Sequence, residues 1–135
     1  MCGRILLLFA PLACFAASTM PPEADQRLAR DIYKEIIEIK SGYTTGATTP
    51  VVQVIAKRLR AAGFSDSDIF LGGAIPTKAN LVVRYHGTGK LKPILLLAHT
   101  DVVEAKREDW SMDPFVFTEK DGFFYGRGTD RKSVV

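Results

Sequence analysis

An apolar run that ends in a histidine and an aspartate two positions apart sets the first limit on the fold of this 135-residue chain. Residues 93–98 read Pro-Ile-Leu-Leu-Leu-Ala, and His99 and Asp101 follow directly. A continuously apolar run of this length predicts a strand that is buried on both faces. Because side chains two positions apart in a strand project to the same face, we expect His99 and Asp101 to lie side by side at the carboxyl end of that strand.

An imidazole with a carboxylate beside it is a common arrangement at zinc sites. A ring nitrogen can bind the ion, while the carboxylate orients the ring, bridges a second ion or acts in catalysis. The spacing leaves open a purely structural alternative, in which the strand runs into a polar turn and His99 is only hydrogen-bonded. One histidine does not make a zinc site by itself, so further ligands are required.

Two motifs further along the chain carry a resemblance to a known family. Residues 109–115 read Asp-Trp-Ser-Met-Asp-Pro-Phe, and residues 125–132 read Tyr-Gly-Arg-Gly-Thr-Asp-Arg-Lys. With the His-x-Asp motif before them, they resemble the signature of the zinc-dependent peptidases and deacylases that include aminoacylases, acetylornithine deacetylase, succinyl-diaminopimelate desuccinylase and glutamate carboxypeptidases. Residues 44–50 and the helix after them resemble the start of that family's catalytic domain.

The resemblance implies a three-layer α/β/α metallopeptidase catalytic domain, with residues 19–135 forming its amino-terminal helices and first strands. It implies two Zn²⁺ ions, with Co²⁺ or Mn²⁺ as alternatives. His99 resembles a ligand of one ion, Asp130 the carboxylate that bridges both, and Asp101 the catalytic-site acid that orients His99. The family pattern has one residue more between the threonine and the aspartate than Thr129-Asp130, whereas the spacing from Asp130 to Lys132 fits.

The activity implied by the resemblance is hydrolysis of an amide or peptide bond, in which paired metal ions polarise the carbonyl and supply hydroxide. A small peptide, an N-acyl amino acid and a glutamate conjugate all remain open as substrates, and the complete enzyme is expected as a homodimer. The family's general-base glutamate and remaining ligands come later than Val135, so we expect a truncated, inactive part of the enzyme. The nearest acids, Glu104, Glu108 and Glu119, are expected on the solvated surface.

Two alternatives belong to other functional classes. The first is a secreted binding module without catalysis, or a decayed gene product, that retains part of the fold. The second is a protein that binds a single metal ion through His99 and Asp101 alone. Tight zinc binding by the chain alone would favour the second, although a site with so few protein ligands binds weakly compared with a closed tetrahedral set.

The first eighteen residues predict a signal peptide. Arg4 precedes the apolar residues 5–15, and small residues follow at positions 16–18, where we expect cleavage. The apolar stretch is shorter than the ~20 residues of a membrane-spanning helix. We therefore expect export to the periplasm or the cell exterior, with a lipoprotein anchored at Cys14 as the alternative. Both cysteines, Cys2 and Cys14, lie in this leader, so the mature protein would have no thiol.

Composition argues against a nucleic-acid partner. The net charge is +3, and basic residues alternate with acids instead of forming a stripe. The other histidine, His86, lies beside the turn at residues 87–90 and is expected on the surface without a metal partner. The aromatic loop at residues 110–115 is expected to pack rather than to bind substrate. Gly126 and Gly128 flank Arg127 and predict a sharp turn that approaches other groups closely.

Periodic apolar residues predict two packing helices before the strands. The first follows Pro22 and ends before Gly42. The second has Thr49 as its N-cap and Pro50 as its first helical residue, and it closes at Gly63. Short strands are predicted over residues 69–71, 80–85 and 93–98.

Overall fold

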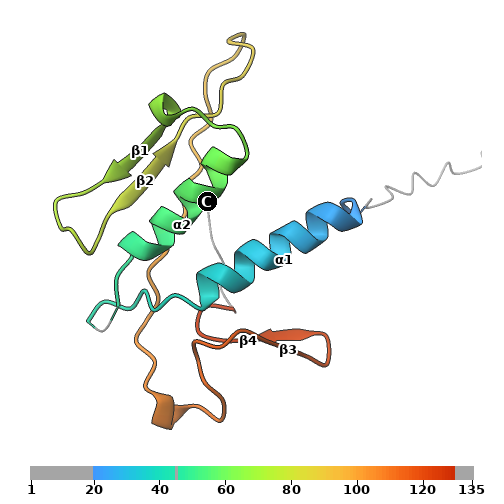
Figure 1. Cartoon of the computed structure of the whole chain (residues 1–135), viewed down its shortest axis with the longest axis vertical. Helices are drawn as coiled ribbons and strands as arrows, with labels where there is room; N and C mark the ends of the chain where they lie inside the picture. Colours follow the sequence, from blue (N-terminus) through green and yellow to red (C-terminus); the bar gives the residue numbers. More distant parts are fainter. Residues whose placement is uncertain (1–19, 45, 130–135) are drawn as a thin grey trace, which may run out of the picture.

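The computed structural model describes residues 20–44 and 46–129, and within them two α-helices lie beside two small antiparallel sheets (Figure 1). This mixture of elements confirms the predicted α/β class in outline. In the part of the chain that is described, no helix is long and apolar enough to span a membrane. The elements are α1 (Glu23–Ile37), α2 (Thr49–Ala61), the 3₁₀ turns η1 (Asp66–Asp68) and η2 (Arg107–Asp109), and the strands β1 (Ile69–Gly72), β2 (Asn80–Val83), β3 (Thr118–Lys120) and β4 (Phe123–Tyr125).

Helix α1 begins directly after Pro22, as predicted, but it ends at Ile37, well before Gly42. The chain beyond the helix has another role. Ser41 accepts a hydrogen bond from the backbone N–H of Val102, at 3.4 Å, and Gly42 forms a parallel β-bridge with Val102. A helical backbone at Ser41 and Gly42 could not make this pairing, which explains why α1 stops early.

Helix α2 confirms the predicted helix, although its N-cap is Thr48 and the prediction of Thr49 was wrong by one residue. The backbone of Thr49 is already helical, and Pro50 lies in the first turn. The hydroxyl of Thr49 donates to the carbonyl of Pro76 at 2.7 Å and accepts from the N–H of Ala79 at 3.0 Å. Thr49 therefore ties the start of α2 to the segment that leads into β2.

The carboxyl end of α2 closes at Gly63, as the sequence predicts. Gly63 has a φ of +92°, a left-handed conformation that glycine adopts readily. Its N–H donates to the carbonyl of Arg60 at 3.0 Å, and the N–H of Phe64 donates to the carbonyl of Leu59 at 3.1 Å. These two bonds make a Schellman motif, which satisfies carbonyls that the helix end would otherwise leave unpaired.

The hairpin of β1 and β2 packs against α2, and together they form the main core. Ile69 pairs with Val83, and Leu71 pairs with Leu81. The strand predicted over residues 69–71 is confirmed, and the strand predicted over residues 80–85 forms but ends at Val83. The buried apolar side chains of this core are Val51, Val52, Ala56, Ile69 and Ala79.

The prediction of a buried strand over residues 93–98 is wrong. This segment has no regular structure, and the side chains from Ile94 to Leu97 are 66% to 86% exposed. A strand needs a neighbouring strand to satisfy its backbone N–H and C=O groups. Strand β2 pairs with β1, and no described segment pairs with residues 93–98. The apolar sequence indicates a preference for burial. Burial as a strand also requires a neighbouring strand to pair with, and the sequence of this segment does not supply one.

Candidate functional site

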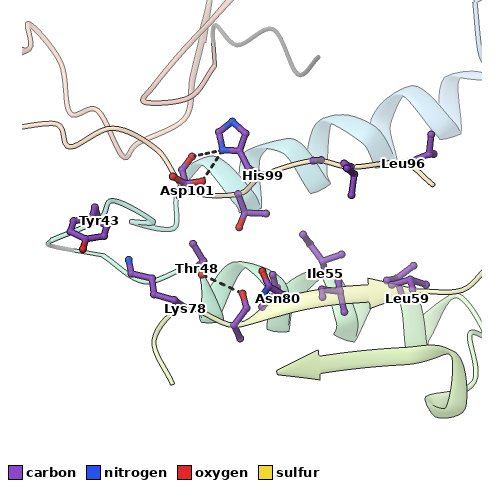
Figure 2. Close-up of a pocket in the computed structure, with 16 residues that line it drawn as sticks. Tyr43, Thr48, Ile55, Leu59, Lys78, Asn80, Leu96, His99 and Asp101 are labelled. Carbon is purple, nitrogen blue, oxygen red and sulfur yellow. Dashed lines mark hydrogen bonds and ion pairs between the residues drawn. The ribbon is translucent and has the colours of Figure 1, made fainter. Parts of the chain in front are cut away.

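His99 and Asp101 lie side by side, although the segment that carries them is not a strand (Figure 2). Nδ1 of His99 is 2.8 Å from Oδ1 of Asp101 and 3.0 Å from the backbone carbonyl oxygen of Asp101. A carbonyl oxygen and an ionised carboxylate can only accept hydrogen bonds. The neutral ring of His99 therefore carries its proton on Nδ1, which leaves the lone pair of Nε2 available to a metal ion.

The chain directly after Asp101 is held from two sides. On one side lies the bridge between Val102 and Gly42. On the other, Nε of Arg127 donates to the carbonyl of Val103 at 2.6 Å, and Nη2 of Arg127 donates to the carbonyl of Glu104 at 3.1 Å. These contacts limit the movement of the His-x-Asp motif, because they attach its carboxyl-terminal end to the loop after α1 and to the turn after β4.

Glu104 has a role that its sequence position did not indicate. Its carboxylate accepts a hydrogen bond from the backbone N–H of Thr44 at 2.5 Å and another from the Thr44 hydroxyl at 2.9 Å. The expectation of a solvated surface residue is wrong for Glu104, which is only partly exposed and fastens the loop after α1. Glu108 and Glu119 are exposed, as expected.

The turn at residues 126–128 confirms the predicted close approach. Gly128 has a φ of +95°, and a Cβ there would lie 3.1 Å from a methyl group of Val102. A Cβ at Gly126 would lie 2.9 Å from a methyl group of Ile37. The turn therefore packs against both the end of α1 and the segment that carries His99. Asp130 follows two residues later and lies outside the described residues, so its role as a bridging ligand stays a prediction.

The aromatic loop before β3 makes packing contacts. Pro114 is fully buried, and its carbonyl accepts a hydrogen bond from the N–H of Arg127 at 2.6 Å. The guanidinium of Arg127 lies 5.8 Å from the centre of the Trp110 ring. These contacts agree with the expected structural role of the loop.

A hollow of about 620 Å³ separates residues 96–101 from the surface of α2 and β2 (Figure 2). His99 and Asp101 lie on one wall, and Lys78 and Asn80 lie on the facing wall. One end of the hollow is therefore polar, and the other is apolar. The apolar end is lined by Val52, Ile55, Leu59, Leu81, Val83, Leu96 and Leu97.

Two polar side chains make contacts that the sequence reasoning missed. Nζ of Lys78 donates to the carbonyls of Gly42 at 3.0 Å and Gly46 at 3.3 Å. Nε2 of His86 is 2.8 Å from Oδ1 of Asp68, so His86 has an acidic partner at the end of η1. None of these three contacts has a local sequence signal, since the partners are 18 to 36 residues apart.

Of the two predicted zinc ligands, His99 lies among the described residues. Its Nε2 is the type of ligand that zinc prefers. Within residues 20–44 and 46–129, no three His, Cys, Asp or Glu side chains gather around one point. The metal-ligand roles of His99 and Asp130 and the catalytic role of Asp101 therefore stay predictions. The predicted signal peptide at residues 1–18 and the alternative lipid anchor at Cys14 lie outside the described residues.

A model of a known protein family matches the part of the chain that contains His99 and Asp101. Residues 95–133 match the family described as Peptidase family M20/M25/M40. Over these residues the chain is similar to that peptidase family. The match confirms the resemblance inferred from the His-x-Asp and Tyr-Gly-Arg-Gly motifs, and it includes both His99 and Asp101.

Several curated relatives extend the similarity beyond the M20 motifs. The chain is 44% identical over 85 residues to a succinyl-diaminopimelate desuccinylase of Bordetella avium, covering 62% of this chain and 21% of the relative. It is 42% identical over 80 residues to an acetylornithine deacetylase of Pasteurella multocida, covering 58% and 20%. It is 29% identical over 153 residues to the N-fatty-acyl-amino acid synthase/hydrolase PM20D1 of Mus musculus, covering 98% and 30%.

The chain thus spans between 20% and 30% of the length of these relatives. No solved structure matches it.

Proposed function

We propose that this chain forms part of the catalytic domain of a zinc-dependent hydrolase that cleaves amide bonds in small peptides or N-acyl amino acids. In this proposal His99 would be a ligand of one zinc ion through Nε2, Asp130 would be the ligand shared by two ions, and Asp101 would orient the imidazole. The whole domain is a three-layer α/β/α structure to which α1, α2 and the β1–β2 hairpin contribute. The observation that carries the proposal is the 2.8 Å contact between Nδ1 of His99 and Oδ1 of Asp101.

The names of the relatives support the choice of reaction. A desuccinylase and a deacetylase are named for the removal of an acyl group, and the third relative is named for N-fatty-acyl-amino acids. An acyl group is the part that these names share. An acyl group held on nitrogen by an amide bond is therefore the class of substrate that we infer for this chain.

The residues around His99 have distinct tasks in this mechanism. Zinc, when bound, polarises the scissile carbonyl and lowers the pKa of a bound water to about 7. Asp101 keeps the proton of His99 on Nδ1, so that the lone pair of Nε2 would be available to the ion. The bonds from Arg127 to the carbonyls of Val103 and Glu104 restrain the backbone that carries both side chains. Co²⁺ or Mn²⁺ suits the same imidazole and carboxylate ligands.

The test compares the two histidines of the chain. Zinc binding is measured by competition with a chromophoric chelator, and amide hydrolysis is measured separately with N-acetyl amino acids. We expect His99→Ala to lower the zinc affinity of the chain at least tenfold, because it removes a ligand, and to abolish hydrolysis when it is made in the complete enzyme. His86→Ala is the matched control, since His86 pairs with Asp68 and does not line the hollow. Equal zinc binding by His99→Ala and the unmodified protein would contradict the proposal.

A further inference from the structure

Tyr33 connects helix α1 to the turn at residues 126–129. Its hydroxyl donates a hydrogen bond to the backbone carbonyl of Thr129 at 2.8 Å, between residues that are 96 positions apart in the sequence. Both residues are half-buried. Thr129 directly precedes Asp130, the predicted ligand shared by two zinc ions. A side chain of α1 therefore holds the backbone next to a predicted metal ligand.

Two aromatic neighbours hold the ring of Tyr33 in place. Its centre lies 5.8 Å from those of both Phe117 and Phe124, and its plane meets that of Phe117 edge-on, at 86°. The guanidinium of Arg30 lies 5.8 Å from the centre of the Phe124 ring. Figure 1 shows α1 alongside the hairpin of β3 and β4, which carries Phe124. A tyrosine side chain has only two χ angles, so packing on its ring gives the hydroxyl a defined position.

The turn itself holds Thr129 from the other side. The N–H of Thr129 donates to the carbonyl of Gly126 at 3.3 Å, and the Thr129 hydroxyl donates to the same carbonyl at 2.9 Å. The carbonyl of Thr129 belongs to the planar peptide group that continues the chain. Because Tyr33 binds this carbonyl, it restrains the direction in which the chain leaves the turn.

We propose that Tyr33 is a positioning residue for Asp130. By holding the carbonyl of Thr129, it presents the carboxylate of the next residue to the zinc ion that His99 binds. This inference rests on the proposed function, which makes Asp130 a metal ligand. A backbone that is held before the ion arrives loses less conformational freedom on binding, and the affinity rises accordingly.

The rival role for Tyr33 is that of a structural tie between α1 and the turn. Loss of such a tie would destabilise the whole chain, and its effect on zinc binding would not depend on the side chain at residue 130. A positioning residue acts on the metal only through Asp130. Dependence on Asp130 is therefore a readout that a merely structural role would not produce.

The experiment titrates zinc into the full chain and follows the NMR signals of the His99 ring, which report weak binding as well as tight binding. Tyr33→Phe keeps the ring and removes only the hydroxyl. We expect it to raise the dissociation constant of zinc about three- to tenfold, the range that the loss of one hydrogen bond allows. In an Asp130→Ala background, Tyr33→Phe is expected to change the dissociation constant no further, as a double-mutant cycle requires for coupled residues.

Tyr85→Phe is the matched control, because it removes the same atom from a tyrosine that packs against Phe64 and is 85% exposed. We expect it to leave the zinc affinity unchanged. If Tyr85→Phe lowers the affinity as much as Tyr33→Phe, the effect does not come from the bond to Thr129, and the inference is wrong.

Two further outcomes overturn the inference while the metal assignment stands. In both of them Asp130→Ala weakens zinc binding. Tyr33→Phe then either leaves the dissociation constant unchanged, or raises it by the same factor with and without Asp130, which assigns Tyr33 to the structural tie. The proposed function fails in a different way: if Asp130→Ala binds zinc as tightly as the unmodified protein, Asp130 is not a ligand, and the positioning role of Tyr33 falls with that assignment.

Discussion

The carboxylate of Glu104 occupies the space beside the α-carbon of Gly42. A Cβ added at residue 42 would lie 2.6 Å from Oε1 of Glu104, closer than real contacts allow. The carboxylate cannot move aside without cost, because it accepts hydrogen bonds from both the N–H and the hydroxyl of Thr44. Gly42 also forms the bridge with Val102, so the absence of a side chain lets the loop after α1 lie against the segment that carries His99.

Gly42→Ala is expected to lower the free energy of unfolding by about 1–3 kcal/mol, the usual cost of forcing a group into an occupied space. The measurement is urea unfolding followed by the fluorescence of Trp110, the only tryptophan of the chain. Gly87→Ala is the control, because a Cβ at Gly87 meets nothing within 4 Å. In the double variant with Glu104→Ala, the added loss from Gly42→Ala should disappear. Equal stability of the variants at residues 42 and 87 would contradict the packing described here.

Gly128→Ala should cost more stability than Gly122→Ala. Both glycines have left-handed φ angles, +95° and +79°, so both substitutions strain the backbone by about 1–2 kcal/mol. Only Gly128 is also crowded, since its Cβ would lie 3.1 Å from a methyl group of Val102. The difference between the two free energies of unfolding, measured in urea, therefore isolates the packing of the turn on Val102. A difference of zero would mean that the turn does not press on this segment.

Asp101→Asn tests the orientation of His99 without removing a metal ligand. The amide of asparagine is neutral and can present a donor to the ring, so His99 loses its charged partner and keeps only the backbone carbonyl of residue 101 as a fixed acceptor for Nδ1. We expect zinc affinity to fall by about 10- to 100-fold, as for other residues that orient a metal-binding histidine. Chelator competition measures this loss, and Asp109→Asn serves as the control on an exposed residue. An unchanged affinity would show that Asp101 does not act through His99.

Local patterns were sufficient to predict helix α2 and the contact of His99 with Asp101, but not where α1 ends. Helix α2 follows from its apolar periodicity, from Pro50 in its first turn and from Gly63 after its end. The contact of His99 with Asp101 involves residues two positions apart, so it depends on local geometry and forms even without a strand. In each case the information lies within a few neighbouring residues.

Contacts between segments that are far apart in the sequence could not be predicted from local residue patterns. Glu104 binds Thr44 across 60 residues, and Lys78 binds Gly42 across 36. Whether such groups meet depends on how α1, the β1–β2 hairpin and the chain after them are arranged, and no residue pattern near Lys78 or Glu104 encodes that arrangement. For the same reason, apolar residues alone could not determine whether residues 93–98 find a strand to pair with.

Hydrogen exchange tests the structure of residues 93–98 directly. The backbone N–H groups from Ile94 to Ala98 have no hydrogen-bond partner among residues 20–44 and 46–129. We therefore expect them to exchange nearly as fast as an unstructured peptide, whereas the amides in the middle of α2, such as that of Ile55, exchange far more slowly because each opening must break helix bonds and core contacts. Exchange read residue by residue with NMR provides both rates in one sample. Protection of Ile94 to Ala98 equal to that of α2 would mean that the segment does form a paired strand, and that the hollow between His99 and Lys78 is narrower than the structure shows.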